Sequence, residues 1–263
     1  MKMIKPLIAG LLIVTGAICL SWTATGKKNP EVYQLTVYKY TTPAQEKVLD
    51  TYLEMALLPA LHRQKLNHIG VFKAIANDTA VVKKLYVLIP GKSMDIFETV
   101  KADLEKDATY LEAGRDYLDA AFNAAPYDRL EHIYLKAFRL APELQLPALT
   151  APKRERVYEL RSYESATEKI FRNKVHMFNE GGEITLFKRL NFNAIFYSEV
   201  VAGSKMPNLM YMTSFENMAD RDAHWKNFGS DTTWKRLSGL AEYKNNVSHI
   251  DIMFLRPASY SDY

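Results

Sequence analysis

The feature that most constrains this chain of 263 residues is an internal repeat. The segment VYQLTVY at 32–38 and the segment VYELRSY at 157–163 share four residues at an offset of 125. Residues 85–110 align with 209–234 at an offset of 124, and 131–135 align with 248–252 at an offset of 117. Offsets that change so little across half a chain indicate that one folding unit has been duplicated.

Both halves show the same order of elements, β-α-β-β-α-β. Alternating Val, Thr and Tyr are typical of strands, and apolar residues three to four positions apart are typical of helices. In the first half we expect strands at 32–40, 69–76, 84–89 and 132–140, and helices at 43–65 and 93–122. In the second half we expect strands at 157–164, 192–200, 208–215 and 248–255, and helices at 167–180, 217–227 and 232–240.

This order predicts an α+β fold made of two tandem ferredoxin-like (βαββαβ) modules. Helices cover one face of such a sheet, and the other face needs a partner. We therefore expect the modules, at 31–140 and 157–257, to pack sheet to sheet as an intramolecular α/β barrel. The segment 141–156 contains three prolines and reads as an extended linker. It is long enough for the alternative, in which each module pairs with another chain and the protein oligomerises.

The N-terminal residues 1–26 read as a secretory signal peptide. Lys2 and Lys5 precede a short apolar run, and small residues at 24–26 form a cleavage site. The alternative is an uncleaved membrane anchor, although the apolar run is short for a membrane span. Cys19 is the only cysteine and lies inside this segment, so cleavage leaves a periplasmic or secreted protein without thiols or stable membrane insertion.

Several classes of function have no support in the sequence. The formal net charge is only +4 and no basic stripe stands out, so a nucleic-acid partner is not expected. The histidines do not show the close spacing of metal ligands, and no metal is expected. Glycine-rich phosphate loops and nucleophile elbows are also missing, so no cofactor is expected.

The second half resembles the NIPSNAP family. Residues 158–163 (YELRSY) are similar to the opening strand of that domain, and Tyr211 with residues 214–221 is similar to its later strand and helix. The resemblance covers most of 157–240 and, more weakly, 32–110, where Gln34 and Thr36 replace the Glu and Arg of the motif. It implies a fold shared with α/β-barrel monooxygenases, and leaves the chemistry undefined because one fold hosts many functions.

Candidate site residues follow from the alternation of side chains along strands. On 157–163, Glu159, Arg161 and Tyr163 share one face, which we expect to point between the two sheets. On the closing strand, His249 and Asp251 are expected on the same inner face. Because the first and last strands of this fold are neighbours, these residues would form one polar pocket, together with Tyr211 of the NIPSNAP-like stretch.

In this pocket His249 would act as a general base, Asp251 or Glu159 would orient it, and Arg161 would hold a substrate. The alternative is a partly buried ion-pair network that fixes the sheet register, or a wet interface between the two sheets. The sequence thus predicts an exported module that binds a protein or a small apolar or carboxylate-bearing ligand. A cofactor-independent oxygenase or isomerase acting in the inter-sheet cavity is the alternative.

Overall fold

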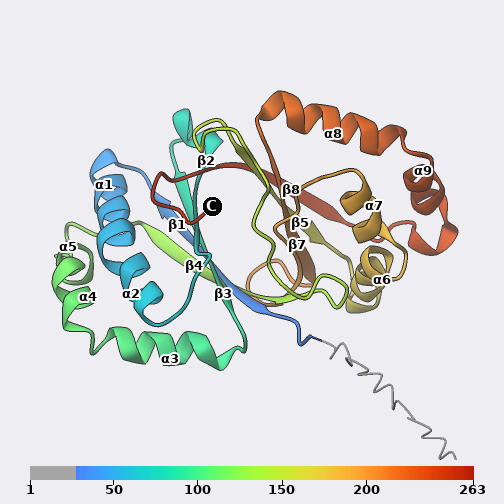
Figure 1. Ribbon diagram of the computed structural model, residues 1–263. Helices are drawn as coiled ribbons and strands as arrows, with labels where there is room; N and C mark the ends of the chain where they lie inside the picture. The colour runs from blue at the N-terminus through green and yellow to red at the C-terminus, as the bar shows by residue number, and fades with distance from the viewer. Residues whose placement is uncertain (1–27) are drawn as a thin grey trace, which may run out of the picture.

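Eight antiparallel strands form a closed barrel in the computed structural model, which describes residues 28–263 (Figure 1). The predicted signal peptide, residues 1–26, lies outside the described residues. Neighbouring strands follow the order β1-β3-β2-β8-β5-β7-β6-β4 around the barrel. The strands are β1 (Val32–Tyr40), β2 (Gly70–Ala74), β3 (Lys83–Gly91), β4 (Arg129–Ala137), β5 (Val157–Glu164), β6 (Phe196–Ala202), β7 (Asn208–Phe215) and β8 (His249–Pro257).

The two halves contribute four strands each in the same relative order, and they join edge to edge. β2 of the first half pairs with β8 of the second, and β4 pairs with β6. The predicted barrel is therefore closed by two hydrogen-bonded ladders in addition to contact between sheet faces. Closure leaves no strand edge of either half unpaired, which removes the edges that promote aggregation.

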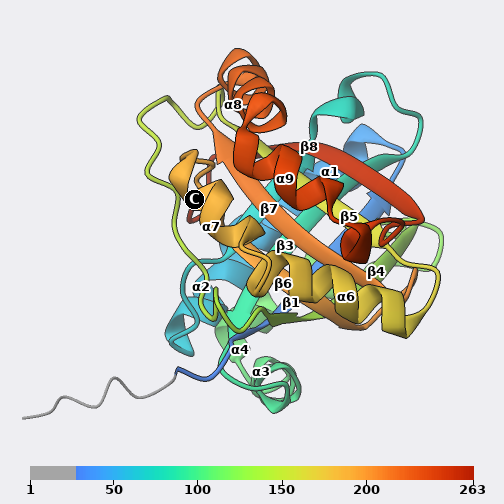
Figure 2. The same ribbon diagram turned by 90° about the vertical axis from the view of Figure 1, so that its right-hand side faces the viewer.

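Helices lie outside the barrel in two separate layers (Figures 1 and 2). The first half provides α1 (Pro43–Tyr52), a π-helical turn (Leu53–Leu57), α2 (Leu58–Arg63), α3 (Asp95–Leu104), α4 (Ala108–Ala113) and α5 (Arg115–Leu118). The second provides α6 (Glu168–Asn179), α7 (Glu183–Arg189), α8 (Met218–Ser230) and α9 (Thr232–Gly239). The expected helix 43–65 thus contains a π-helical turn, and α7 was not predicted.

Capping side chains set the first residues of several helices. Thr42 forms a capping box with Gln45 at the start of α1, while Asn217 and Asp231 accept hydrogen bonds from the first turns of α8 and α9. The break between α6 and α7 falls at Gly182, whose φ of 90° is in the left-handed region that glycine tolerates. These signals place each helix at a defined point against its sheet.

The barrel interior is apolar, which reverses the predicted faces of β5, whereas β8 turns the side that carries His249 and Asp251 inward as predicted. Tyr158 and Leu160 of β5, expected beneath the helices, are fully buried in a cluster with Tyr33 and Leu35 of the first half. Glu159, Arg161 and Tyr163 consequently lie beneath the second-half helices. The interior needs apolar side chains from both halves to fill it, whereas the outer faces can pair polar groups with helix residues.

Residues 258–263 fold back from β8 onto β2 at one end of the barrel. Ala258 N–H donates to Val71 C=O, Val71 N–H donates to Ser261 Oγ, and Ile69 N–H donates to Asp262 Oδ2 at 2.7 Å. Tyr263 is 3 % exposed and belongs to the interior cluster. This segment therefore completes the core at that end.

Within residues 28–263, no helix combines the length and hydropathy required to cross a membrane.

Candidate functional site

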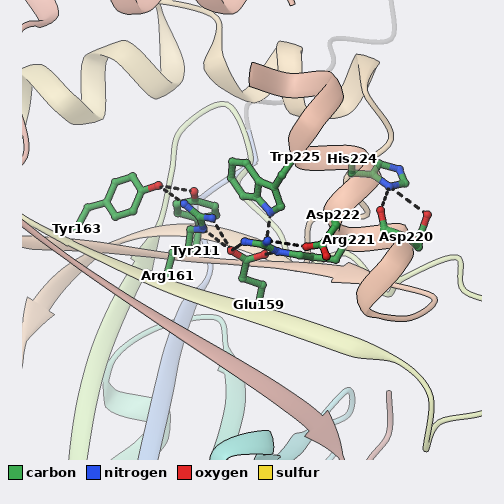
Figure 3. Close-up of polar contacts among 9 residues, drawn as sticks. All are labelled: Glu159, Arg161, Tyr163, Tyr211, Asp220, Arg221, Asp222, His224 and Trp225. Atoms are coloured by element: carbon green, nitrogen blue, oxygen red, sulfur yellow. Dashed lines mark hydrogen bonds and ion pairs between the residues drawn. The ribbon is translucent and has the colours of Figure 1, made fainter. Parts of the chain in front are cut away.

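Glu159 is the centre of a polar network between the second-half sheet and α8 (Figure 3). Its side chain has 0 % exposure and accepts four hydrogen bonds from the side chains of three residues. Arg161 Nε lies 2.6 Å from Oε1, Arg221 donates at 2.8 and 3.0 Å, and Trp225 Nε1 donates to Oε2 at 2.8 Å. One buried carboxylate therefore joins two arginines and the indole of α8.

Arg161 extends this network toward two tyrosines. Its Nη1 donates to Tyr163 Oη at 3.0 Å, and Tyr163 Oη lies 2.9 Å from Tyr211 Oη. The guanidinium carbon is 3.8 Å from the centre of the Trp225 ring, within cation–π distance. Burial raises the pKa of Tyr211 well above its ordinary value, so its hydroxyl stays neutral.

This arrangement corresponds to a packed network rather than an open pocket. Four predicted site residues, Glu159, Arg161, Tyr163 and Tyr211, are brought together, and their charged groups are paired with one another or with α8. Arg161 is only 9 % exposed. The alternative from the sequence, a buried ion-pair network, is the better description of these four residues.

His249 and Asp251 lie elsewhere, so the prediction of one shared face is wrong. The β5–β8 register places Arg161 opposite Ile252 and Glu159 opposite Phe254, whereas Asp251 is opposite Ser162. Asp251 therefore belongs to the opposite face of the sheet. The inward face expected for His249 and Asp251 is the one that β8 has, and the error lies in β5, whose apolar side was assigned to the helices but fills the interior.

His249 sits at the rim of the barrel with its side chain 58 % exposed. Its Nε2 lies 3.2 Å from Asp251 Oδ1, and together with Glu164 these residues offer three ligand atoms within 4.8 Å of one another. The Lys205 ammonium contacts Asp251 and lies 3.6 Å from Glu164. Lys205 thus already supplies the positive charge that this group of carboxylates attracts.

The first half has a pocket of about 300 Å³ at the position that corresponds to the Glu159 network. We call it the sheet–helix pocket. Gln34 and Thr36 correspond to Glu159 and Arg161 at the offset of 125. It is lined by residues of β1, β3, β4 and the first-half helices, which are Gln34, Thr36, Tyr38, Tyr52, Leu57, Leu61, Ile89, Phe97, Glu98, Val100, Lys101, Leu104, Tyr110, Tyr117, Leu130, His132 and Tyr134.

The difference between the halves lies in the size and direction of a few side chains. At the offset of 124, Phe97 and Lys101 of α3 correspond to Arg221 and Trp225 of α8. Strand pairing supports this offset, because Tyr38 pairs with Leu85 as Tyr163 pairs with Leu209. In the first half, Thr36 stands where the second half has the longer Arg161, and the exposed Lys101 stands where it has Trp225. This space therefore remains open in the first half.

Among the titratable groups that line this pocket, histidine is the residue type whose ordinary pKa lies nearest to pH 7, and the pocket contains one, His132. Its Nδ1 lies 2.9 Å from Thr36 Oγ1, and no group in residues 28–263 is hydrogen-bonded to Nε2. Loss of hydration and, second, the Lys101 ammonium lower the pKa of His132. The neutral imidazole therefore predominates at pH 7. In the tautomer whose Nδ1–H donates to Thr36 Oγ1, Nε2 is able to accept a proton; in the other tautomer Nε2–H is a hydrogen-bond donor.

Phenol groups form the remaining polar wall. Tyr52 Oη lies 2.8 Å from Tyr110 Oη, and the rings of Tyr52 and Tyr117 stack with centres 3.7 Å apart. Burial raises the pKa of Tyr38 to about 12 and raises that of Tyr52 further. These hydroxyls are neutral at physiological pH, and they act as hydrogen-bond donors and acceptors rather than as bases.

Sequence reasoning missed this pocket because it followed the family motif, which is complete only in the second half. The sequence signal for the pocket was the departure of the first half from the family motif, since Gln34 and Thr36 stand where the motif has Glu and Arg. His132 and Tyr134 pair with Thr36 and Gln34 across the β1–β4 ladder.

Comparisons with known proteins found a family match for the second half and solved structures that share the fold of most of the chain. The NIPSNAP family model matches residues 158–262. A proposed monooxygenase from Lactobacillus acidophilus NCFM has a TM-score of 0.57 at 11 % identity, covering 87 % of this chain and 94 % of its own. A proposed monooxygenase from Fusobacterium nucleatum subsp. nucleatum ATCC 25586 has a TM-score of 0.54 at 6 % identity, with coverages of 87 % and 93 %.

An anthrone oxidase-like protein has a TM-score of 0.54 at 11 % identity, covering 88 % of this chain and 93 % of its own. At these identities the likeness concerns the fold alone. No curated protein sequence matches the chain. The family model confirms the resemblance found in the second half, since residues 158–262 of this α/β-barrel protein match the NIPSNAP family.

Proposed function

We propose that this protein binds a small, flat, mainly apolar molecule with a carbonyl or hydroxyl group in its sheet–helix pocket. The observation that carries this proposal is a pocket of about 300 Å³ in the first half, at a position filled by paired charges in the second. Its volume is at the lower end of small-molecule sites, and its apolar walls with few convergent polar groups are typical of them.

The residues of the pocket favour this class of ligand. Phe97, Ile89 and Leu104 supply apolar surface, while Tyr134, Gln34 and His132 supply hydrogen-bonding groups. Gln34 Nε2 donates to Tyr134 Oη at 3.2 Å, which orients that hydroxyl. Neutral donors and acceptors on an apolar wall select a neutral ring ligand with a polar substituent over a multiply charged one.

Filling the pocket should abolish this binding. Lys101→Trp introduces at α3 the residue found at the corresponding position of α8, and we expect at least a tenfold loss of affinity because the ring occupies ligand space. Calorimetric titration with anthrone and related hydroxylated aromatic ketones measures it, a choice that follows the name of one structural neighbour. Lys106→Trp, on an exposed residue that does not line the pocket, is the matched control. Equal binding by both variants would place the ligand elsewhere.

A second candidate function, a cofactor-independent enzyme, is favoured by His132. Its neutral imidazole, in the tautomer protonated at Nδ1 and with Nε2 without a partner among the described residues, is suited to take a proton from a carbon that is conjugated with a carbonyl group, as the anthrone methylene is through its aromatic rings. The product of that step is an enolate, and the proton resides on Nε2. Neutral phenols nearby would donate hydrogen bonds to the enolate oxygen.

Proton exchange tests this second function without assuming an overall reaction. In deuterated water, the wild-type protein should accelerate exchange of the anthrone methylene protons, followed by NMR, and His132→Asn should lose that acceleration at least 100-fold. Because its pKa is lowered, the base should remain active at a lower pH than a free histidine would. Anthrone that binds without faster exchange would leave binding as the function.

The finer description of the fold belongs to this proposal as well. We infer that each half is a copy of one ferredoxin-like module, supported by the shared strand order and by the match of repeat offsets to strand register. In this interpretation the second copy kept the packed network and the first copy kept the pocket. Export and oligomerisation stay predictions from the sequence.

A further inference from the structure

The open end of the barrel contains a second pocket, of about 320 Å³, distinct from the sheet–helix pocket. We call it the barrel-mouth pocket. It lies at the opposite end of the strands from Tyr263, since its residues on β1 and β8 are Val37 and Asp251 rather than Tyr33 and Leu255. It is lined by Leu35, Val37, Lys39, Lys84, Tyr86, Glu131, Ile133, Ser162, Ser204, Lys205, Asn208, Met210, Asp251, Ile252 and Met253.

A row of cations without anionic partners borders this pocket. Lys39 of β1 pairs directly with Lys84 of β3 on one side and with Arg129 of β4 on the other. None of these three side chains lies within 4.0 Å of a carboxylate in the part of the chain that the structure describes. Like charges directly opposite each other on neighbouring strands destabilise the pairing, so a bound anion would relieve their repulsion.

The anionic side chains of the rim already have partners. Asp251 contacts the Lys205 ammonium, and Glu131 accepts a hydrogen bond from Ser204 Oγ at 2.5 Å. Glu131 keeps its negative charge, because serine is neutral, so the lining carries three ammonium groups and two carboxylates, a surplus of one positive charge, with Lys39 and Lys84 not in ion pairs. A ligand with one negative group would find two ammonium groups available to it.

The floor of the pocket is different in character from its rim. Val37, Ile133 and Met210 form an apolar surface continuous with the barrel interior. Asn208, 2 % exposed, donates to Ser162 Oγ at 2.8 Å, whereas its Oδ1 is buried with no hydrogen-bond partner among residues 28–263. An unsatisfied buried acceptor is costly, and a ligand hydroxyl or a water could satisfy it.

From these features we propose that the barrel-mouth pocket binds an amphiphilic carboxylate, with its chain on the apolar floor and its carboxylate on Lys39 and Lys84. The rim provides charge complementarity and the floor provides apolar contact. This inference is independent of the proposed function, because the two sites share no lining residue.

Methionine methyl NMR locates the ligand directly. Titration of the full chain with decanoate below its micellar concentration should shift the methyl signals of Met210 and Met253, which line the pocket. Met94 and Met218, exposed on the surface elsewhere, should not shift. No methionine lines the sheet–helix pocket, so occupation of that site would not produce this pattern.

A charge variant tests the role of the two lysines. The double variant Lys39→Gln with Lys84→Gln should weaken decanoate binding at least tenfold and leave decanol binding unchanged, since decanol lacks the charge. The double variant Lys226→Gln with Lys235→Gln, which removes two exposed charges from α8 and α9, should bind decanoate like the wild type. Higher ionic strength should weaken the binding of decanoate to the wild type and leave the binding of decanol unchanged.

Two results would overturn the proposal. One is a decanoate titration that leaves Met210 and Met253 unchanged. The other is a Lys39 and Lys84 variant that binds decanoate as tightly as the wild type. Loss of anthrone binding in Lys101→Trp does not affect either outcome. The proposals for the two sites are therefore tested separately.

Discussion

Glu159→Gln should lower the free energy of unfolding by about 3–5 kcal/mol, the usual cost of leaving buried charges without their partner. The substitution keeps the shape of the side chain and removes the charge that holds Arg161 and Arg221. It also places an amide N–H₂ group against donors. Urea denaturation of the full chain measures the change, with an unchanged slope indicating that the folded state remains compact.

An exposed glutamate is the matched control for this result. Glu112 pairs with Arg115 on the surface, with side-chain exposures of 70 % and 62 %, so Glu112→Gln should change stability by less than about 1 kcal/mol. Replacing the network as a whole with Glu159→Gln, Arg161→Met and Arg221→Met should recover part of the loss. A cost for Glu159→Gln as small as that of the control would mean that the network is not desolvated.

Tyr263→Ala should be about as damaging, with an expected loss of about 3–5 kcal/mol, typical of removing a buried aromatic ring. Tyr263 is 3 % exposed, and its ring centre lies 5.5 Å from that of Phe72 and 6.2 Å from that of Tyr158. Its removal would open the barrel interior at one end. Differential scanning calorimetry of the full chain would record a lower unfolding temperature.

The hydroxyl of Tyr263 should contribute little to this stability. It is buried without a hydrogen-bond partner in the described chain, as are the hydroxyls of Tyr33 and Tyr158. Tyr263→Phe should therefore be neutral or slightly stabilising, because a polar group is removed from an apolar core. A loss for Tyr263→Phe as large as that for Tyr263→Ala would reveal a hydroxyl interaction that matters more than ring packing.

Local pattern was sufficient for most elements of this fold. β5 and β7 have the predicted bounds, since alternating apolar residues and turn-forming neighbours define a strand without reference to the rest of the chain. The repeat and the order of elements predicted a barrel-like α+β architecture for the same reason. The repeat is visible in the sequence because it depends on residue identity alone.

Strand faces and strand partners could not be obtained in this way. Alternation shows that Glu159 and Tyr158 point to opposite sides, but both faces of β5 are buried, so either side satisfies the pattern. The rule that the apolar side lies beneath the helices gave the correct face for β8, with His249 and Asp251 inward, and the wrong face for β5. His249 was assigned to the site of Arg161 for that reason.

What the sequence by itself determined is the repeat, the α+β class and the NIPSNAP-like second half, all of which depend on local composition and spacing. Only the tertiary structure decided that the apolar faces fill the barrel while Glu159 and Arg161 pair with α8. It also decided that Thr36 and Lys101 leave a pocket at a position that Arg161 and Trp225 fill in the second half. The physical reason is that a cavity depends on the summed volumes of side chains from several elements, which no single stretch of sequence contains.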